Sequence, residues 1–260
     1  MAASKYPIIF VYGIFVKEMK HFKAFGGIEK ALKKVGFDVY TAHTDGFGTI
    51  ENNALQLKEE IEKILKQKNV EKVNIIAYSK GGNDAIYMLD NLGMQDSVAS
   101  VTMLSAPLKG SRLADVFLSV PKFLLKPGAV CMNCLYKILG DKHPNSFQVL
   151  HELKHIPDEE YPPEIEFPSI YCQSYSSRIN SYFDDLLLGV PFKILQRFEK
   201  TPCDGAVTAN SAKWGEYKGE CMAEPLSHRQ LMDFLVGKKK KQKLYQFYIS
   251  LCRDLAERGF

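Results

Sequence analysis

Apolar residues follow two alternating patterns along the first part of the chain. Short continuous runs such as IIFV and VNIIA are typical of strands that are buried on both faces. Between these runs, apolar residues recur every three or four positions, as on the buried face of an amphipathic helix. The patterns predict strands at 7–11, 37–42, 73–77 and 98–107, and helices near 27–35, 54–65 and 81–92.

Strand and helix alternate four times with short connections, which is typical of parallel βαβ units. The sequence therefore predicts the α/β class, with a mostly parallel central sheet flanked by helices. The alternation stops at about Lys109, and helical or loop-like segments separated by prolines continue to Pro168. A strand from Ser169 and a final amphipathic helix follow. We interpret 1–260 as one domain with a helical insertion at about 113–168.

Composition narrows the classes of function. The 260 residues are 46% hydrophobic and 25% charged, as in a globular protein with a substantial core. A net charge of +4 without arginine-rich stripes argues against nucleic-acid binding. No apolar stretch reaches the roughly 18 residues needed to span a bilayer, and no secretory signal is visible. The default expectation is a cytoplasmic protein, or a secreted one if a signal peptide has been removed.

The six cysteines do not suggest a disulfide framework. Cys131 and Cys134 form a lone C-x-x-C pair, with neither a second pair nor histidines at ligand spacing nearby. We interpret both as small, semi-buried residues and expect no zinc site.

Ser79 stands where chemistry is expected in a parallel sheet. It follows the apolar run VNIIAY and precedes two glycines that begin a helix. Ligands of such sheets bind beyond the carboxyl ends of the strands. The frame Ala77-Tyr78-Ser79-Lys80-Gly81 fits the G-x-S-x-G nucleophile elbow, with alanine in place of the first glycine. The sequence therefore predicts a nucleophilic serine on a sharp strand-to-helix turn.

A serine hydroxyl needs a base to take its proton and an acid to orient that base. In this kind of fold both partners follow the serine, the acid first and the histidine last. Only His228, in EPLSHRQ, falls after the last predicted strands. The other histidines precede the serine or lie in the insertion; they are His21, His43, His143, His151 and His155. We therefore predict His228 as the base.

The acid has three candidates. Asp204 lies in TPCDGAVT, on a turn about two dozen residues before the histidine, and is followed by a turn glycine. Asp184 and Asp185 compete with it, but they precede a helix or loop and lack that glycine. Asp204 is the preferred choice.

Four segments carry a resemblance to a known family. They are KYPIIFVYGI, VNIIAYSKGG, SVTMLSAPLKGSRLAD and DGAVTANSAKWGE, the last shortly before LSHRQ. With these motifs the chain resembles the bacterial true lipases of the pseudomonad type, within the α/β-hydrolase superfamily. The resemblance implies that Ser79, Asp204 and His228 form the catalytic triad. It also implies an oxyanion hole made by the backbone N–H groups of Ile14 and Lys80.

The chain also departs from that family. Tyr12 stands where the family has a histidine beside the oxyanion glycine, and Leu108 replaces the histidine of a proline–histidine pair. The family's structural calcium uses an aspartate two residues after the triad histidine, where this chain has Gln230. Asp184 or Asp185 would supply a single carboxylate, so no cofactor or metal is expected, although the resemblance raises calcium. The resemblance also raises a Cys172–Cys221 disulfide.

By the same resemblance the insertion is a lid. Its apolar residues line or cover an acyl-chain groove, or else pack the insertion onto the sheet; they are Phe117, Leu118, Val120, Phe123, Leu124, Leu125, Leu135, Ile138 and Leu139. The lysine run at 238–243 is interpreted as a solvated helix start, with anionic lipid headgroups as the alternative.

These observations predict a serine hydrolase that cleaves carboxylic esters through an acyl-enzyme on Ser79. The apolar insertion favours a lipase or esterase acting on medium- to long-chain acyl esters, with a lipid or ester substrate and transient contact with a lipid surface. One alternative is a phospholipase or acyltransferase with the same triad. Another is a non-catalytic lipid binder on the hydrolase scaffold, which Tyr12 and Leu108 favour and the complete triad opposes.

Overall fold

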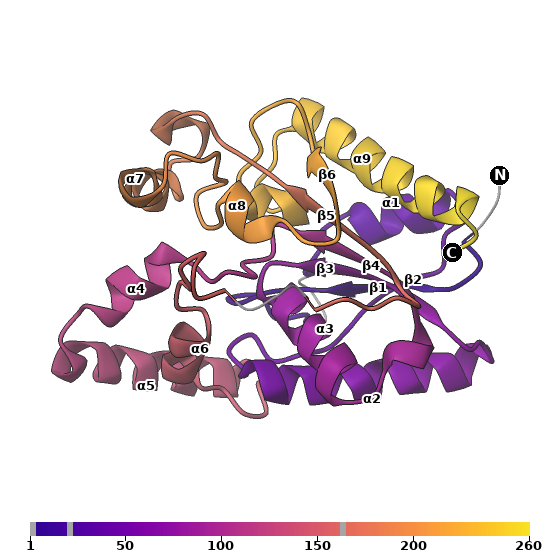
Figure 1. Ribbon diagram of the computed structural model, residues 1–260, viewed down its shortest axis with the longest axis horizontal. Helices are drawn as coiled ribbons and strands as arrows, with labels where there is room; N and C mark the ends of the chain where they lie inside the picture. The colour runs from indigo at the N-terminus through magenta and orange to yellow at the C-terminus, as the bar shows by residue number, and fades with distance from the viewer. Residues whose placement is uncertain (1–3, 20–22, 162–164) are drawn as a thin grey trace.

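A computed structural model describes residues 4–19, 23–161 and 165–260 of the chain (Figure 1). The strands are β1 (Ile8–Val11), β2 (Val39–Thr41), β3 (Val73–Tyr78), β4 (Val98–Leu104), β5 (Tyr171–Ser176) and β6 (Glu216–Glu220). The α-helices are α1 (Ile28–Lys34), α2 (Ile50–Lys68), α3 (Lys80–Asn91), α4 (Arg112–Leu118), α5 (Lys122–Ile138), α6 (Ser146–Glu152), α7 (Gly189–Phe198), α8 (Ala209–Ala212) and α9 (Lys238–Glu257). Short 3-10 helices are η1 (Gln95–Ser97), η2 (Tyr182–Asp184) and η3 (His228–Met232).

The strands form one sheet in the order β2-β1-β3-β4-β5-β6. Each neighbouring pair is parallel, so the predicted α/β class and parallel sheet are confirmed. The carboxyl ends of all these strands therefore meet at one edge of the sheet.

Helices cover both faces of the sheet because successive side chains of a strand point to opposite sides. Ile8 and Phe10 of β1 pack with α1 and α9, while Ile9 and Val11 pack with α2 and α3. Figure 1 shows these two helical layers on either side of the sheet. The four β1 side chains are fully buried, and each such burial contributes roughly 1.5–3 kcal/mol to folding.

Three elements differ from the sequence-based expectation. The β4 strand ends at Leu104 rather than Pro107, because Ser105 turns the chain with a φ of 46°. The strand β6 and the helix α7 were not predicted. The sequence of β6, EYKGE, lacks an apolar run because this edge strand is only partly buried.

The last helix begins at Lys238, the first residue of the lysine run, so the interpretation of this run as a helix start is confirmed. Lys241 and Lys243 form ion pairs with Asp233 and Glu224.

The insertion between β4 and β5 supplies α4, α5 and α6, which lie with α7 at the carboxyl end of the sheet (Figure 1). Of the nine apolar residues singled out from its sequence, six are exposed to solvent rather than packed beneath the helices; they are Phe117, Phe123, Leu124, Leu135, Ile138 and Leu139. These six therefore do not pack the insertion onto the sheet.

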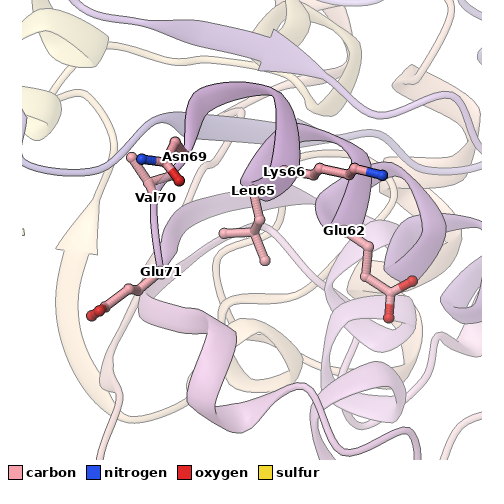
Figure 2. Close-up of a pocket in the computed structure, with 6 residues that line it drawn as sticks. All are labelled: Glu62, Leu65, Lys66, Asn69, Val70 and Glu71. Atoms are coloured by element: carbon pink, nitrogen blue, oxygen red, sulfur yellow. The ribbon is translucent and has the colours of Figure 1, made fainter.

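A pocket of about 520 Å³ lies at the C-terminal end of α2, and Figure 2 shows the side chains that line it. The pocket is lined by Glu62, Leu65, Lys66, Asn69, Val70 and Glu71. The helix α2 returns the chain from the carboxyl end of the sheet to the amino end. This pocket therefore lies at the amino ends of the strands, whereas Ser79 lies at the carboxyl end of β3. None of the helices in the described part of the chain combines the length and the apolar character that crossing a membrane requires.

Candidate active site

Ser79 occupies a strained turn between β3 and α3. Its φ of 54° and ψ of −137° lie in a region that side-chain-bearing residues rarely adopt. The Ser79 backbone N–H donates to the Leu104 carbonyl of the neighbouring strand, at 3.1 Å, and so fixes the turn to the sheet. The result is the predicted elbow, with the serine at the start of a helix and 6% exposed.

The glycines after the serine are required by close contacts with neighbouring backbone and side-chain atoms. A Cβ atom on Gly81 would lie 2.7 Å from the Tyr12 carbonyl oxygen. A Cβ atom on Gly82 would lie 2.5 Å from the Cβ of Ala106. Ala77 takes the place of the first motif glycine and is fully buried, so the elbow accommodates its methyl group.

The structure brings Ser79, His228 and Asp204 together in one hydrogen-bonded chain. Ser79 Oγ lies 2.9 Å from His228 Nε2, and His228 Nδ1 lies 2.8 Å from Asp204 Oδ2. An ionised carboxylate can only accept, so we assign the imidazole proton to Nδ1. In that tautomer, Nε2 accepts from the Ser79 hydroxyl, as a general base for this serine must.

Asp204 is held by its own turn and by a neighbouring strand. Its Oδ1 accepts from the backbone N–H groups of Ala206 and Val207, at 3.0 and 2.8 Å, while Gly205 turns the chain with a φ of 96°. Its Oδ2 also accepts from the Ser177 hydroxyl at 3.0 Å. Burial by itself would raise the pKa of Asp204, but the charge and hydrogen bond of His228 and these backbone donors hold that pKa below its usual value.

Tyr78 and Ser177 contribute to the site, although sequence reasoning did not identify them. The Tyr78 ring lies against the His228 imidazole, with centroids 4.7 Å apart, and its hydroxyl donates to the His228 carbonyl at 2.9 Å. The His228 backbone N–H donates to the Asp204 carbonyl at 3.0 Å. Tyr78 is next to the serine in sequence, yet only the fold brings it to a residue 150 positions away.

The competing candidates lie elsewhere. Among the histidines that the structure describes, His228 alone hydrogen-bonds Ser79. His43, His143 and His151 are exposed and His155 is half-buried. His21 lies outside the described residues. Asp184 accepts from the backbone N–H groups of Asn180 and Ser181, so it caps η2 and does not contact the imidazole.

The loop after β1 runs directly beside the serine. A Cβ atom on Gly13 would lie 2.8 Å from Ser79 Oγ and 3.1 Å from the Lys80 backbone nitrogen. No acceptor for the backbone N–H of Ile14 or Lys80 is found among the described residues. The oxyanion role of these two N–H groups stays a prediction, which this placement favours.

The Lys80 side chain points away from the reaction site into the protein. Its ammonium pairs at 2.6 Å with Asp84, and Asn53 donates to the same carboxylate at 3.2 Å. Burial raises the pKa of Asp84 to about 6, and the charge and hydrogen bond of Lys80 oppose that shift. The contact ties the first turn of α3 to α2.

Tyr12 and Lys17 anchor the oxyanion loop. The Tyr12 hydroxyl, in a side chain that is almost fully buried, donates to the Thr44 carbonyl at 2.7 Å. Lys17 bridges two buried carboxylates, at 3.3 Å from Asp45 and 3.0 Å from Asp141. Tyr12 thus provides a hydrogen-bonded anchor for this loop.

The insertion packs on the same loop. Tyr136 of α5 donates to the Phe15 carbonyl at 2.8 Å. Ile14 packs against a small cluster of insertion residues, Ala114, Val149 and Leu153. The insertion therefore supports the oxyanion loop directly.

We expect Gly13→Ala to lower kcat by about 10²- to 10³-fold, the cost of losing an oxyanion donor. The added methyl group would displace the loop, because it would lie 2.6 Å from the Cβ of Ser79. Steady-state kinetics on a soluble ester checks this. Gly128→Ala is the matched control, because its methyl group would meet open space on α5 and leave kcat unchanged. Wild-type kcat in Gly13→Ala would contradict the placement of the oxyanion loop.

The structure offers no metal-binding set within 4–19, 23–161 and 165–260, where no three His, Cys, Asp or Glu side chains cluster. The six cysteines, all within the described part of the chain, form no disulfide, including between Cys172, which is half-buried, and Cys221, which is buried; Cys131 and Cys134 are exposed. The interpretation of Cys131 and Cys134 as semi-buried residues was therefore wrong.

The order serine, aspartate, histidine on this parallel sheet is the order found in the α/β-hydrolase fold. The metagenomic carboxyl esterase MGS0156 shares the fold with a TM-score of 0.74, at 16% identity, over 98% of this chain and 76% of that one. No protein-family profile matches the chain.

Two relatives are similar in sequence. Triacylglycerol lipase 2 of Saccharomyces cerevisiae is 28% identical over 258 residues, covering 90% of this chain and 73% of the yeast protein. A triacylglycerol lipase of Vibrio cholerae is 33% identical over 114 residues, covering 44% of this chain and 36% of that protein. The chain is therefore a carboxylic ester hydrolase that is similar in sequence to triacylglycerol lipases.

Proposed function

We propose that the protein is a lipase that cleaves medium- to long-chain acyl esters through an acyl-enzyme on Ser79. The hydrogen-bonded chain from Ser79 through His228 to Asp204 carries this proposal. The names of the yeast and Vibrio relatives support triacylglycerols as the substrate class.

In the acylation half of the reaction, Ser79 Oγ attacks the ester carbonyl carbon while His228 Nε2 takes the hydroxyl proton. Asp204 stabilises the resulting imidazolium and keeps Nδ1 protonated. The carbonyl oxygen becomes an oxyanion that the N–H groups of Ile14 and Lys80 stabilise. Collapse of this intermediate breaks the ester bond, and the imidazolium returns the proton to the leaving alcohol.

Water completes the cycle. His228 takes a proton from the attacking water, and the hydroxide adds to the acyl carbon. The second tetrahedral intermediate expels Ser79, which recovers its proton from His228, and the fatty acid leaves. Replacement of water by another alcohol would give acyl transfer, and a phospholipid would serve with the same triad. We favour water and a neutral ester because the named relatives are lipases.

The preference for long acyl chains rests on the apolar surface at the carboxyl end of the sheet. The insertion exposes Phe123 and Ile138 by 75% and 83%, and Phe183 near α7 is also 83% exposed. The helix α4 packs against α5 and α7, and α7 packs against η2, so the segments that carry these side chains lie at the same end of the molecule (Figure 1). Exposed apolar side chains in such numbers mark a surface for lipid contact.

Pseudomonad-type membership is part of the proposal and rests on the four sequence motifs. The comparisons do not by themselves favour a bacterial type of lipase, because the yeast relative aligns over more of the chain than the Vibrio relative does. The non-catalytic alternative loses its main support, because Tyr12 is hydrogen-bonded and anchors the loop.

The test is hydrolysis of p-nitrophenyl esters from acetate to palmitate, together with an emulsified triacylglycerol. We expect the maximum of kcat/KM at octanoate or longer, and a rate on triacylglycerol that rises once the substrate forms an interface. A maximum at acetate or butyrate would retain the hydrolase and contradict the lipase. No turnover at any length, with no labelling by a fluorophosphonate, would favour the non-catalytic binder.

A further inference from the structure

Asp185 is a buried carboxylate that does not take part in the triad. It is 3% exposed and lies between η2 and α7. Its Oδ1 accepts from the backbone N–H groups of Leu187 and Leu188, at 3.0 and 3.3 Å, which fixes the carboxylate at the end of its own loop. Its other oxygen, Oδ2, is directed toward a segment more than forty residues further along the chain.

Oδ2 contacts the residue on each side of His228. The Ser227 hydroxyl donates to it at 2.5 Å, and Arg229 Nε lies 2.7 Å from it as an ion pair. Ser227 is fully buried, and the Arg229 side chain is 19% exposed. One carboxylate therefore holds both sequence neighbours of the histidine that hydrogen-bonds Ser79.

These contacts bear on the geometry of the base. Ser227 precedes η3, and its backbone N–H donates to the Gln230 side chain at 3.2 Å, so the turn that presents the imidazole begins at this residue. Arg229 also donates through Nη1 to the Phe234 carbonyl at 2.8 Å, at the far end of the turn. A shift of the turn would move His228 Nε2 relative to Ser79 Oγ, and small misplacements of this kind lower the rate of reaction.

We infer that Asp185 is a positioning residue for His228, acting through Ser227 and Arg229, and that the Arg229 guanidinium supplies beside the histidine the positive charge that the sequence resemblance assigns to a calcium ion. This inference rests on the proposed hydrolysis by Ser79 and His228. It gives the turn of η3 a defined anchor made only of protein groups.

The donor set does not fit calcium. A hard cation of this size needs six to eight oxygen ligands, several of them carboxylates. Both oxygens of Asp185 already accept from protein donors, and a guanidinium cation occupies the space beside Oδ2. Gln230 Oε1 is also engaged, by Ser227. A calcium ion would have to displace Arg229 and would meet its positive charge.

The test compares Asp185→Asn with Asp184→Asn. Asparagine at 185 keeps the shape and leaves the Arg229 charge without its partner, so we expect kcat on a soluble ester to fall roughly 10- to 100-fold with KM within twofold. Asp184 is the matched control, because it lies in the same loop and contacts only its own turn; its variant should keep wild-type kcat. Equal kcat in wild type and Asp185→Asn would overturn the inference.

Two further variants keep the test valid if Asp185→Asn does not fold. Ser227→Ala and Arg229→Gln each remove one arm of the contact and should lower kcat in the same direction. The Asp185→Asn/Arg229→Gln double variant should lose no more than the worse single variant, because both residues act as one unit. Losses that multiply would contradict a shared role.

A proton NMR spectrum provides a readout that does not depend on turnover. The His228 Nδ1 proton, hydrogen-bonded to Asp204, should resonate far downfield in wild type and in Asp184→Asn, and should broaden or shift in Asp185→Asn. An unchanged resonance would overturn the positioning role. If wild type showed the resonance but no esterase activity, the proposed function would fail while the positioning role would remain.

Calcium is tested on the wild type. Millimolar calcium and EDTA should leave kcat and the thermal midpoint unchanged within error. Loss of activity in EDTA that calcium restores would overturn the assignment of the cationic role to Arg229.

Discussion

Replacing Ser79 by alanine is expected to lower kcat on a p-nitrophenyl ester by about 10⁶-fold, the effect of removing a triad serine in a serine protease. The reason is chemical, since no other hydroxyl is hydrogen-bonded to His228 Nε2 among the described residues. The methyl group of alanine keeps the strained backbone of the elbow, so the free energy of unfolding should change by less than about 1 kcal/mol. Steady-state kinetics and thermal unfolding measure the two quantities.

Ser119→Ala is the matched control for this variant. Ser119 is an exposed serine at the end of α4 that donates to the Val116 carbonyl. Its variant should retain full activity and full labelling by a fluorophosphonate, whereas Ser79→Ala should lose both. Labelling that persists in Ser79→Ala would show that another residue is the nucleophile.

Replacing Asp204 by asparagine is expected to lower kcat by about 10⁴-fold while KM changes little, as in other Ser-His-Asp enzymes. The Oδ1 of asparagine would still accept from Ala206 and Val207. Its amide N–H would then face His228 Nδ1, which would have to become the acceptor. The imidazole proton would move to Nε2, and the histidine could no longer take the Ser79 proton.

Kinetics of Asp204→Asn beside Asp185→Asn separates the acid from the positioning residue. Asp204→Asn should lose on the order of 100-fold more kcat than Asp185→Asn. The reason is that Asp204 contacts the His228 imidazole, whereas Asp185 contacts the residues on either side of His228. Activity in Asp204→Asn above a tenth of wild type would place the catalytic acid elsewhere.

The sheet could be predicted because its strands are buried on both faces. Ile8–Val11 and Val73–Tyr78 carry continuous buried runs, and those runs are visible in any linear reading. The edge strand Glu216–Glu220 could not be predicted, because only its pairing with β5 makes it a strand. The helix α7 could not be predicted either, because a glycine and a proline in its first turn make its sequence pattern ambiguous.

The triad could be predicted for a different reason. Ser79 is marked by its elbow, Asp204 by the turn glycine at 205, and His228 by its place after the last predicted strands. Each signal is local or depends on chain order. Tyr78, Ser177 and Asp185 carry no such signal, because their contacts with the triad or its neighbours join residues 27 to 150 positions apart.

The sequence alone therefore determined the parallel α/β sheet, Ser79 and His228 as the predicted nucleophile and base, and the presence of an insertion, since apolar periodicity, turn chemistry and chain order can be read directly from the chain. Only the tertiary structure decided which carboxylate serves His228 and which serves its neighbours, that Tyr12 and Lys17 anchor the loop after β1, and that Phe123, Leu124, Leu135 and Ile138 of α5 face solvent. The physical reason is that hydrogen bonds and ion pairs act over about 3 Å of space, without regard to separation along the chain.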